Sequence, residues 1–492
     1  MGLERETKLQ VPPGFRLPDL RGEGLEAEDQ PVERLLTTYV DTPDLRIARW
    51  GSSLRHRGGE GWTVKLPAPD EGALLARSEH VFDGADPRKL PVGAADLLRA
   101  FVRGAELAPV ARLRTRRAGI EVRDELGRAI ARVTDDEVSV MDGRRVATRF
   151  REVEIELDPS TSSDVGEVLV ARLREAGAGP VDNVSKLRRA LGPRADEAPD
   201  VVVEDLDEDA TVADVVRSAL AASAVRLLTH DAGVRLGEDP EDVHQARVAT
   251  RRLRSDLRTF GDFLDPTWAK PLRNVLKGLG SALGAVRDAE VLRDQLRSRL
   301  SELPDADRSS GGALIDDLET TRAEARAELL ATIREARYVE LLDAIVAAAR
   351  TPRVLEEFAS SPGRKAFGPL LDAPWNHLEA AIDRARHEAS NEALHNARIR
   401  AKRVRYAAEA VAPVVGKTAR KFAEAAADLQ DVLGEHQDAV VAGAWLRESR
   451  TGEHAFVAGQ LAALEAEAAR FARDRWPAAW KALSRKRLRF WT

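Results

Sequence analysis

The segment Glu4-Arg5-Glu6-Thr7-Lys8 (ERETK) places an acid, a second acid and a lysine at every other position. Residues two apart project from the same face of a β-strand, so the segment predicts a strand with Glu4, Glu6 and Lys8 on one face. Two neighbouring carboxylates repel each other unless a cation lies between them, and a nearby lysine is a natural partner for an anion. The pattern therefore suggests a metal bound together with a phosphate. An isolated segment of this kind is more often an exposed strand edge, so the interpretation depends on the rest of the sequence.

Other alternating stretches in the first 190 residues carry charge in the same way. Phe150 to Leu157 (FREVEIEL) places Glu152, Glu154 and Glu156 on one strand face. Cations with matching spacing are Arg55 and Arg57, Lys65, and Arg112, Arg114 and Arg116, with Lys186 following near the end. If these charged faces line one concave surface, they form the polar interior of a closed barrel that holds a metal-chelated polyphosphate. Arg117 competes with Arg116 for the inward position if that strand carries a bulge.

Composition limits the chemistry of such a site. The chain of 492 residues is long for one core and suits two or three domains. It has no cysteine, which excludes disulfides, thiolate zinc sites and cysteine nucleophiles, so any metal should be a hard ion held by oxygen atoms. No apolar run approaches the length of a membrane span, and the start lacks the apolar segment of a secretory signal. We therefore expect a cytoplasmic protein without membrane contact.

The character of the sequence changes near residue 200. Residues 1–194 read as a β-rich domain, and residues 195–210 as a solvated linker, because the segment from Gly192 to Thr211 carries eight acids against one arginine. Residues 211–492 are alanine-rich with helical periodicity, which predicts an all-α domain. The expected fold class is therefore an α+β multidomain protein.

The helical part contains an internal repeat. His244-Gln-Ala-Arg247-Val-Ala-Thr-Arg251-Arg252-Leu-Arg254 returns about 150 residues later as His395-Asn-Ala-Arg398-Ile-Arg-Ala-Lys402-Arg403-Val-Arg405. Leu283-Gly284-Ala-Val-Arg287-Asp288-Ala289 likewise returns as Leu433-Gly434-Glu-His436-Gln437-Asp438-Ala439. The repeat predicts two helical bundles, at about residues 211–345 and 365–492, related by duplication.

Each repeat predicts an apolar helix stripe beside a cationic one. The basic candidates are His244, Arg247, Arg251, Arg252, Arg254 and Arg258 in the first copy and His395, Arg398, Lys402, Arg403 and Arg405 in the second. A solvated face is the usual fate of one such stripe. Here, however, only Asp256 interrupts residues 247–258, and dense like charges repel unless a polyanion compensates them. A helical histidine is more often a packed residue, but its recurrence in both copies favours a phosphate ligand.

The N-terminal pattern resembles the CYTH or triphosphate tunnel metalloenzyme family. The resemblance covers about residues 1–190. It rests on Glu4-x-Glu6-x-Lys8, Arg55-x-Arg57, Thr63-x-Lys65, Arg77-Ser78-Glu79, Arg114-x-Arg116, the Asp135-Asp136 pair and the Glu152/Glu154/Glu156 strand. It implies an eight-stranded antiparallel tunnel that hydrolyses a terminal phosphoanhydride of a triphosphate with Mg²⁺ or Mn²⁺.

The same resemblance implies roles for individual residues. Catalysis would involve Glu4, Glu6 and Lys8. The implied metal ligands are Glu4, Glu6, Glu79, one of Asp135 and Asp136, and two of Glu152, Glu154 and Glu156; the implied triphosphate-binding residues are Lys8, Arg55, Arg57, Lys65, Arg114, Arg116 and Lys186. Strand alternation does not decide which of Asp135 and Asp136 faces inward.

The duplicated helical signature resembles the CHAD family and covers about residues 208–492. The resemblance implies two antiparallel four-helix bundles, related by a pseudo-two-fold axis, whose basic stripes bind inorganic polyphosphate. Gln437 stands where the first copy has Arg287, so the second copy offers one cation fewer.

The two resemblances favour a divalent-metal-dependent triphosphatase with a module that binds polyphosphate or tripolyphosphate. One alternative is a non-catalytic polyphosphate-binding protein that targets polyphosphate granules. Another is thiamine triphosphatase or adenylate cyclase activity, because the tunnel resemblance fixes the triphosphate and not its organic part. Nucleic-acid binding is disfavoured, since the cations lack aromatic stacking partners and the chain has only three tyrosines.

Overall fold

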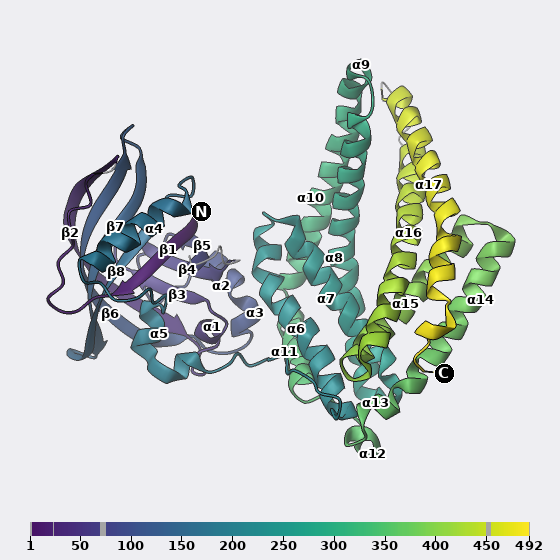
Figure 1. Ribbon diagram of the computed structural model, residues 1–492, viewed down its shortest axis with the longest axis horizontal. Coiled ribbons are helices and arrows are strands. Elements are labelled where there is room, and N and C mark those ends of the chain that lie inside the picture. The colour runs from purple at the N-terminus through teal and green to yellow at the C-terminus, as the bar shows by residue number, and fades with distance from the viewer. Residues whose placement is uncertain (1, 23, 69–74, 449–453, 492) are drawn as a thin grey trace. The chain divides into compact units, whose positions relative to one another are not determined.

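The computed structural model describes residues 2–22, 24–68, 75–448 and 454–491, which fold as two compact units (Figure 1). The first unit spans Met1–Asp200 and the second Val201–Thr492. Asp200 is the last residue of the first unit. Its side chain accepts a hydrogen bond from Trp50 Nε1 (2.9 Å) and forms a buried ion pair with Arg103. The first residues of the acidic segment 195–210 therefore pack on the β-rich unit.

The first unit is built on a closed antiparallel barrel. Its described strands are β1 (Gly2–Gln10), β2 (Leu25–Asp41), β3 (Ser53–Arg57), β4 (Gly61–Pro67), β5 (Leu75–Phe82), β6 (Ala108–Asp124), β7 (Ala129–Asp142) and β8 (Arg145–Leu157). They pair in the order β1-β5-β4-β3-β2-β6-β7-β8, and β8 pairs again with β1. The eight-stranded antiparallel architecture predicted for this unit is thus confirmed.

Six short helical segments accompany the barrel. They are α1 (Arg46–Arg49), α2 (Val92–Leu97), α3 (Arg99–Val102), α4 (Ser163–Glu175), α5 (Lys186–Leu191) and the 3₁₀ turn η1 (Gly192–Asp196). Helix α4 begins at the N-cap Ser162, whose side chain accepts a hydrogen bond from Asp164 N, and packs on the outer face of β8. Its Leu169 and Leu173 bury the outward residues Val153 and Ile155. This outer core leaves the intervening glutamates of β8 facing the barrel interior.

Part of the barrel interior is apolar. Leu113 of β6, Val138 and Val140 of β7, and Leu187 of α5 pack together with Tyr39 in one buried cluster. A register shift in β2 between Gln30 and Glu33 reverses which alternate residues of that strand face inward. The interior therefore has an apolar part, filled by side chains, beside a polar cavity.

The second unit is entirely helical. Its main described helices are α6 (Val212–Leu236), α7 (Pro240–Thr259), α8 (Pro266–Ser301), α10 (Gly312–Arg334), α11 (Ala336–Arg350), α14 (Asp372–Glu388), α15 (Asn391–Val415), α16 (Lys417–Glu448) and α17 (Ala455–Leu483). Shorter segments are η2 (Gly261–Phe263), α9 (Asp305–Arg308), η3 (Ser309–Gly311), α12 (Glu356–Ala359), α13 (Gly363–Ala366), η4 (Gly368–Leu371) and η5 (Lys486–Leu488). Within the described residues, no helix is both long enough and apolar enough to cross a membrane.

The repeated segments form equivalent helices. The first signature lies on α7, which starts at the N-cap Asp239 with Pro240 at its first position, and the second lies on α15, capped by Ser390. The predicted apolar stripes are confirmed as buried: Val243, Ala246, Thr250, Leu253, Leu257 and Phe260 in the first copy and Leu394, Ala397, Ala401, Val404, Ala408 and Val411 in the second. Helices α7 and α15 contact each other, so the two cationic stripes meet. The pseudo-two-fold relation of the bundles stays a prediction.

Candidate functional site

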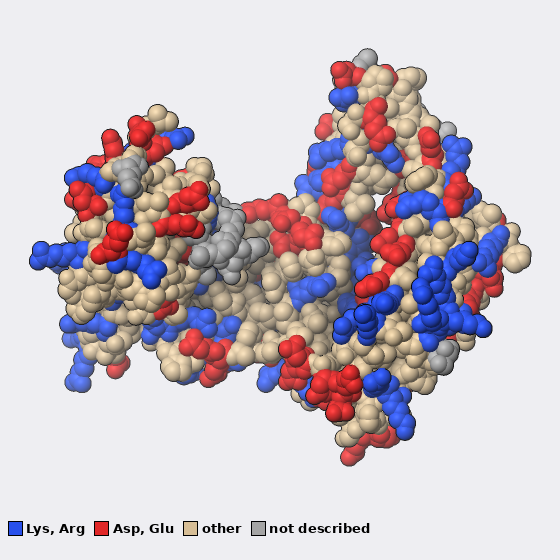
Figure 2. Space-filling model, in the orientation of Figure 1, with Lys and Arg blue, Asp and Glu red and all other residues tan. Residues whose placement is uncertain are grey.

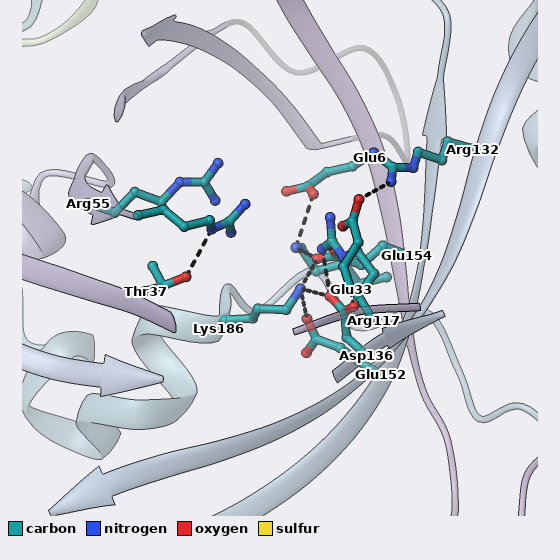
Figure 3. Close-up of polar contacts among 12 residues, drawn as sticks. Glu6, Glu33, Thr37, Arg55, Arg117, Arg132, Asp136, Glu152, Glu154 and Lys186 are labelled. Atoms are coloured by element: carbon teal, nitrogen blue, oxygen red, sulfur yellow. Dashed lines mark hydrogen bonds and ion pairs between the residues drawn. The ribbon is translucent and has the colours of Figure 1, made fainter. Parts of the chain in front are cut away.

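The polar part of the barrel interior encloses a cavity of about 290 Å³. Charged side chains from most strands line it (Figure 3). The lining residues are Glu6, Lys8, Glu33, Tyr39, Ser53, Arg55, Arg57, Glu60, Lys65, Arg77, Glu79, Arg117, Arg132, Thr134, Glu154, Glu156, Ser185, Lys186 and Leu187. Acids concentrate on the β1 and β8 side, whereas β3 and β4 contribute cations.

The opening segment occupies the acidic side of the cavity. Lys8 is buried, and its Nζ lies 3.0 Å from Glu6 Oε2 and also pairs with Glu154. Burial alone would lower the pKa of Lys8, but the charges of Glu154 and Glu6 outweigh it and raise that pKa. Lys8 therefore stays protonated and holds two carboxylates together.

Behind this pair, Lys186 meets three carboxylates. Its Nζ lies 2.9 Å from Asp136 Oδ2, 3.0 Å from Glu152 Oε1 and 2.7 Å from Glu154 Oε1 (Figure 3). Burial alone would raise the pKa of Glu154, but Lys186 and the neighbouring cations hold it well below its usual value. Burial raises the pKa of Glu152, which lies deeper in the barrel wall.

Two arginines complete this network. Arg117 donates from Nε to Asp136 Oδ1 (2.8 Å) and from Nη2 to Asp136 Oδ2 (2.6 Å), and its Nη2 also reaches Glu154 Oε2 (3.1 Å). Arg189 Nε lies 3.2 Å from Glu152 Oε2. Each deep carboxylate thus has a protein cation as its partner.

The facing side of the cavity is cationic. Arg55 and Lys65 share Glu79, with Arg55 Nη2 3.3 Å from Oε1 and Lys65 Nζ 3.1 Å from Oε2. Arg57 donates from Nε to Thr37 Oγ1 (3.1 Å) and pairs with Glu60 at 2.9 Å. Burial alone would raise the pKa of Glu79. The charges of Lys65 and Arg55 outweigh this effect, so the pKa of Glu79 falls below its usual value. On this side of the cavity Arg55 and Lys65 share one carboxylate, that of Glu79, so the excess of positive charge suits an anion.

The structure brings most of the predicted site residues of the first unit together. The backbone of Glu4 pairs with Arg77 in β1 and β5, but its side chain lies outside the described residues. Glu6, Lys8, Arg55, Arg57, Lys65, Glu79, Asp136, Glu152, Glu154, Glu156 and Lys186 all belong to the cavity or the network behind it.

Two predicted positions are wrong, and the open choice between Asp135 and Asp136 is decided. Asp135 faces outward, where Arg151 Nη2 lies 2.6 Å from its Oδ2, so Asp136 is the inward member of the pair. Arg114 and Arg116 are exposed on the outer face of β6, and Arg116 pairs there with Glu137. The inward frame of β6 is instead Leu113, Thr115 and Arg117, because Leu113 fills the apolar part of the barrel interior.

Sequence reasoning did not assign five charged lining residues to the site: Glu33, Glu60, Arg77, Arg117 and Arg132. Arg77 lies in the Arg77-Ser78-Glu79 motif, two residues before Glu79, and strand alternation alone would have placed it beside that residue. Glu33 and Arg132 form an ion pair at 3.5 Å. Arg117 lines the cavity and takes the inward position that the sequence pattern gives to Arg116 unless the strand carries a bulge. No local signal marks Glu33, because the register shift in β2 reverses the alternation just before it.

The donor set fits a hard divalent metal. All acids of the cavity offer oxygen atoms, which Mg²⁺ and Mn²⁺ prefer. Glu6 and Glu156 face each other across β1 and β8, and a cation between facing carboxylates relieves their repulsion. Within the described side chains, which exclude Glu4, no three acids already converge as a metal-binding group. The residues therefore suit a metal chemically, while Lys8 and Lys186 already pair with several of these acids.

In the helical unit, the two cationic stripes converge between α7 and α15. Burial lowers the pKa of Lys402 to about 7, and the charges of Arg251, Arg398 and Arg247 act in the same direction. The Nε atoms of Arg251, Arg254 and Arg398 are buried and have no hydrogen-bond partner in the described structure. Such buried, unpaired donors are expected where an absent anion completes the site.

Glycines in the second repeated motif lie against the side chains of Arg247 and Arg398. A Cβ added to Gly284 of α8 would lie 3.8 Å from Arg247 Nε, and one added to Gly434 of α16 would lie 3.6 Å from Arg398 Nε. One turn later, Asp288 Oδ1 lies 2.9 Å from Arg247 Nη1, and Asp438 faces Arg398. The motif therefore supports the arginines of the first motif in both copies.

The two histidines sit in matched but unequal settings. His395 Nδ1 lies 2.9 Å from Gln437 Oε1. Burial lowers the pKa of His244, the charge of Glu241 opposes this shift, and the charges of Arg287, Arg251 and Arg247 reinforce it. The substitution of Gln437 for Arg287 thus places a neutral group beside the second histidine.

The remaining predicted basic residues divide into two groups. Arg252 and Arg405 both pair with Glu409 of α15, and Arg252 also lies over the Tyr406 ring, so Arg252 links α7 to α15 while Arg405 pairs within its own helix. Arg254, Arg258 and Arg403 instead join Arg273 and Arg400 in a second cationic cluster. Lysine and arginine side chains form patches on the face of the helical unit shown in Figure 2.

Comparisons with known proteins match both units. The CYTH domain family matches residues 2–191 and the CHAD domain family matches residues 218–447. The protein MT2285 of Mycobacterium tuberculosis strain CDC 1551 / Oshkosh is 31% identical over 528 residues, covering 98% of this chain and 96% of that protein. The protein Rv2226 of strain H37Rv gives the same identity and coverage.

Two solved structures are similar to parts of the chain. PptA from Streptomyces chartreusis is 23% identical and covers 55% of this chain and 100% of its own, with a TM-score of 0.45. The CHAD domain from the plant Ricinus communis is 25% identical and covers 58% of this chain and 92% of its own, with a TM-score of 0.39.

Proposed function

The chain belongs to the family of proteins that join a CYTH domain to a CHAD domain, and from this membership we propose that its barrel hydrolyses tripolyphosphate or a related triphosphate. CYTH domains are those of triphosphate tunnel metalloenzymes and generally depend on divalent metal. The observation that carries the proposal is the polarity of the cavity. Acids lie along β1 and β8, cations along β3 and β4, and the space between them is about 290 Å³.

The acidic side is the proposed place for the metal. Glu6, Glu154 and Glu156 would hold it, together with Glu4 as the sequence predicts. When bound, Mg²⁺ or Mn²⁺ polarises phosphate oxygens and makes water a better nucleophile.

The chain's own cations would bind the phosphates. Arg55, Arg57 and Lys65 each face the cavity, where phosphate oxygens can compete with acids such as Glu79 and Glu60 for their donors. Charge-assisted hydrogen bonds from these residues orient the chain of phosphates and stabilise charge that develops on the leaving phosphate. Lys8 links the two sides, since it holds Glu6 and Glu154 in place.

The helical unit is the proposed binding module for longer inorganic polyphosphate. Burial lowers the pKa of Lys402 most, and the charges of Arg251, Arg398 and Arg247 lower it further; a polyanion relieves that repulsion. The buried unpaired donors of this cluster supply hydrogen bonds to phosphate oxygens.

Phosphate release from tripolyphosphate, ATP and thiamine triphosphate, each with Mg²⁺ or Mn²⁺, tests the proposal and identifies the organic part of the substrate. We expect Lys65→Met to raise KM at least about tenfold, the loss of one charge-assisted contact. Lys89→Met is the matched control, because Lys89 is exposed outside the cavity. Equal kinetics for the two variants would contradict the assigned phosphate side.

One observation favours the non-catalytic alternative, in which the barrel only binds polyphosphate. The deep acids already have protein cations as partners, and no three described acids form a group that could hold a metal ion. Polyphosphate binding by the full chain without phosphate release from any of the three substrates would favour this alternative, including targeting to polyphosphate granules.

A further inference from the structure

Lys186 lies inside the barrel wall, where its ammonium group is surrounded by carboxylates. Three carboxylates from β7 and β8 lie within 3.0 Å of its Nζ: those of Asp136, Glu152 and Glu154. The side chains of Asp136 and Glu152 are 0% exposed, so water does not reach them. The ammonium group of Lys186 therefore supplies the positive charge at the centre of these three carboxylates.

The remaining oxygens of the two deepest acids also lie beside cations. Arg117 donates to both oxygens of Asp136, whereas Arg189 Nε lies 3.2 Å from the second oxygen of Glu152 as an ion pair without hydrogen-bond geometry. Lys186, Arg117 and Arg189 therefore already supply positive charge to Asp136, Glu152 and Glu154, and Arg189 Nη2 also lies 3.0 Å from Asp182 Oδ2. A divalent ion added here would place two more positive charges beside these three cations in a dehydrated wall, which is strongly unfavourable.

The backbone around Lys186 fixes it in this position. The preceding segment is bonded to β1: Asp182 N donates to Lys8 O (2.8 Å), and Lys8 N donates to Asn183 Oδ1 (3.2 Å). Ser185 caps α5 by accepting from Arg188 N, and Leu187 is buried in the apolar part of the barrel. Lys186 lies between these two anchors, so it is held as part of the barrel wall.

We propose that Lys186 takes the place of a second metal ion. The barrel then holds a single divalent ion, at Glu6, Glu154 and Glu156, while Asp136 and Glu152 position Lys186 and Arg117 and are not metal ligands. This inference rests on the proposed metal-dependent function, and it replaces the sequence-based assignment of Asp136 and Glu152 as ligands.

Electron paramagnetic resonance of the full chain titrated with Mn²⁺ alone tests this without measuring hydrolysis. The wild-type protein should bind one ion in the barrel, with the spectrum of an isolated Mn²⁺. Lys186→Met should bind a second, and the spectrum should show coupling between two neighbouring ions. Lys65→Met is the matched control: it also removes a lysine from the cavity, but its ion pair with Glu79 lies on the cationic side, so one isolated ion is expected.

A coupled pair of ions in the wild-type protein would overturn the inference and leave the proposed function standing. A single ion in a folded Lys186→Met protein would also overturn it. Because that variant leaves three acids without their shared partner, Glu152→Gln provides a second test that keeps Lys186. We expect Glu152→Gln to bind one ion as tightly as wild type, and a loss of the ion would contradict the inference. No bound Mn²⁺ in any variant would contradict the proposed metal-dependent function itself.

Discussion

Glu6 of β1 lies directly opposite Glu156 of β8, two residues along from the pair formed by Lys8 and Glu154. Like charges that face each other across two strands are destabilising, so this part of the barrel wall needs a cation. Lys8 supplies one from its own strand by holding Glu6 and Glu154. The relationship explains why the opening segment alternates acids with a lysine, and it is the basis for placing the proposed metal here.

Neighbouring arginines of β6 should differ sharply in their effect on stability. Arg117→Met removes the partner of the buried Asp136 and should lower the free energy of unfolding of the barrel by about 3 kcal/mol. Arg116→Met breaks only an exposed pair with Glu137 and should change it by less than about 1 kcal/mol. Hydrogen exchange of the β7 and β8 amides measures both. A larger effect for Arg116 would show that the inward frame of β6 is assigned wrongly.

Gly284, which lies against the Arg247 side chain, should be required for polyphosphate binding. Gly284→Leu would push the Arg247 guanidinium from its place, and we expect binding at least about tenfold weaker, as for a lost hydrogen bond to a charged group. Gly278→Leu on the same helix is the control, since no atom lies within 4 Å of an added Cβ there. Calorimetry with polyphosphate of defined length distinguishes them, and Gly434→Leu should reproduce the effect in the second copy.

Polyphosphate affinity should fall as pH rises above 7. The free protein has Lys402 with a pKa of about 7, and bound phosphates would raise that pKa, so binding takes up a proton in this window. Affinity should therefore weaken by up to about tenfold per pH unit above 7. Lys402→Arg should remove this dependence, because arginine stays charged. The groups facing Lys402 are Arg247, Arg251, Arg398 and Asp438, and an unchanged slope in Lys402→Arg would assign the proton to another group.

Asp256 should make the helical unit less stable at alkaline pH. It is buried on α7, and burial raises its pKa to about 7, with Glu409 acting in the same direction and Arg252 opposing. The folded state therefore keeps a proton that the unfolded chain loses near pH 4, and stability declines from about pH 4 to 7. Asp256→Ala should be more stable than wild type at pH 8 by about 1–3 kcal/mol. The second copy has the buried Ala407 at this position. Hydrogen exchange of α7 at pH 5 and pH 8 measures the difference.

The sequence was sufficient for the architecture and for most of the residues around the cavity. Strand alternation identified Glu6, Lys8 and the three glutamates of β8, and the outward neighbours of the glutamates, Val153, Ile155 and Leu157, are apolar and pack with α4. The repeated motifs identified α7 and α15 in the same way, since each cationic stripe adjoins a buried apolar stripe. These patterns are local, so no knowledge of distant contacts was needed.

The errors came from contacts between distant segments. Alternation in β6 allows either of two sets of residues to face the barrel interior. The charge pattern favours the set with Arg114 and Arg116, whereas packing of Leu113 against Val138 and Leu187 turns the other set inward. The choice between Asp135 and Asp136 likewise depends on Arg151 and Arg117, which come from neighbouring strands. The position of Lys186 among acids follows from how its segment is bonded to β1, which the sequence alone does not show.

The most direct test of the proposed function is the rate of phosphate release from tripolyphosphate by the purified full chain with Mg²⁺ or Mn²⁺. We expect metal-dependent release that Glu6→Gln lowers by at least about a hundredfold, the effect of losing a group that positions metal and substrate. Glu137→Gln, on the outer face of β7, should retain the wild-type rate. Absence of release from the wild-type protein, or equal rates for Glu6→Gln and wild type, would contradict the account.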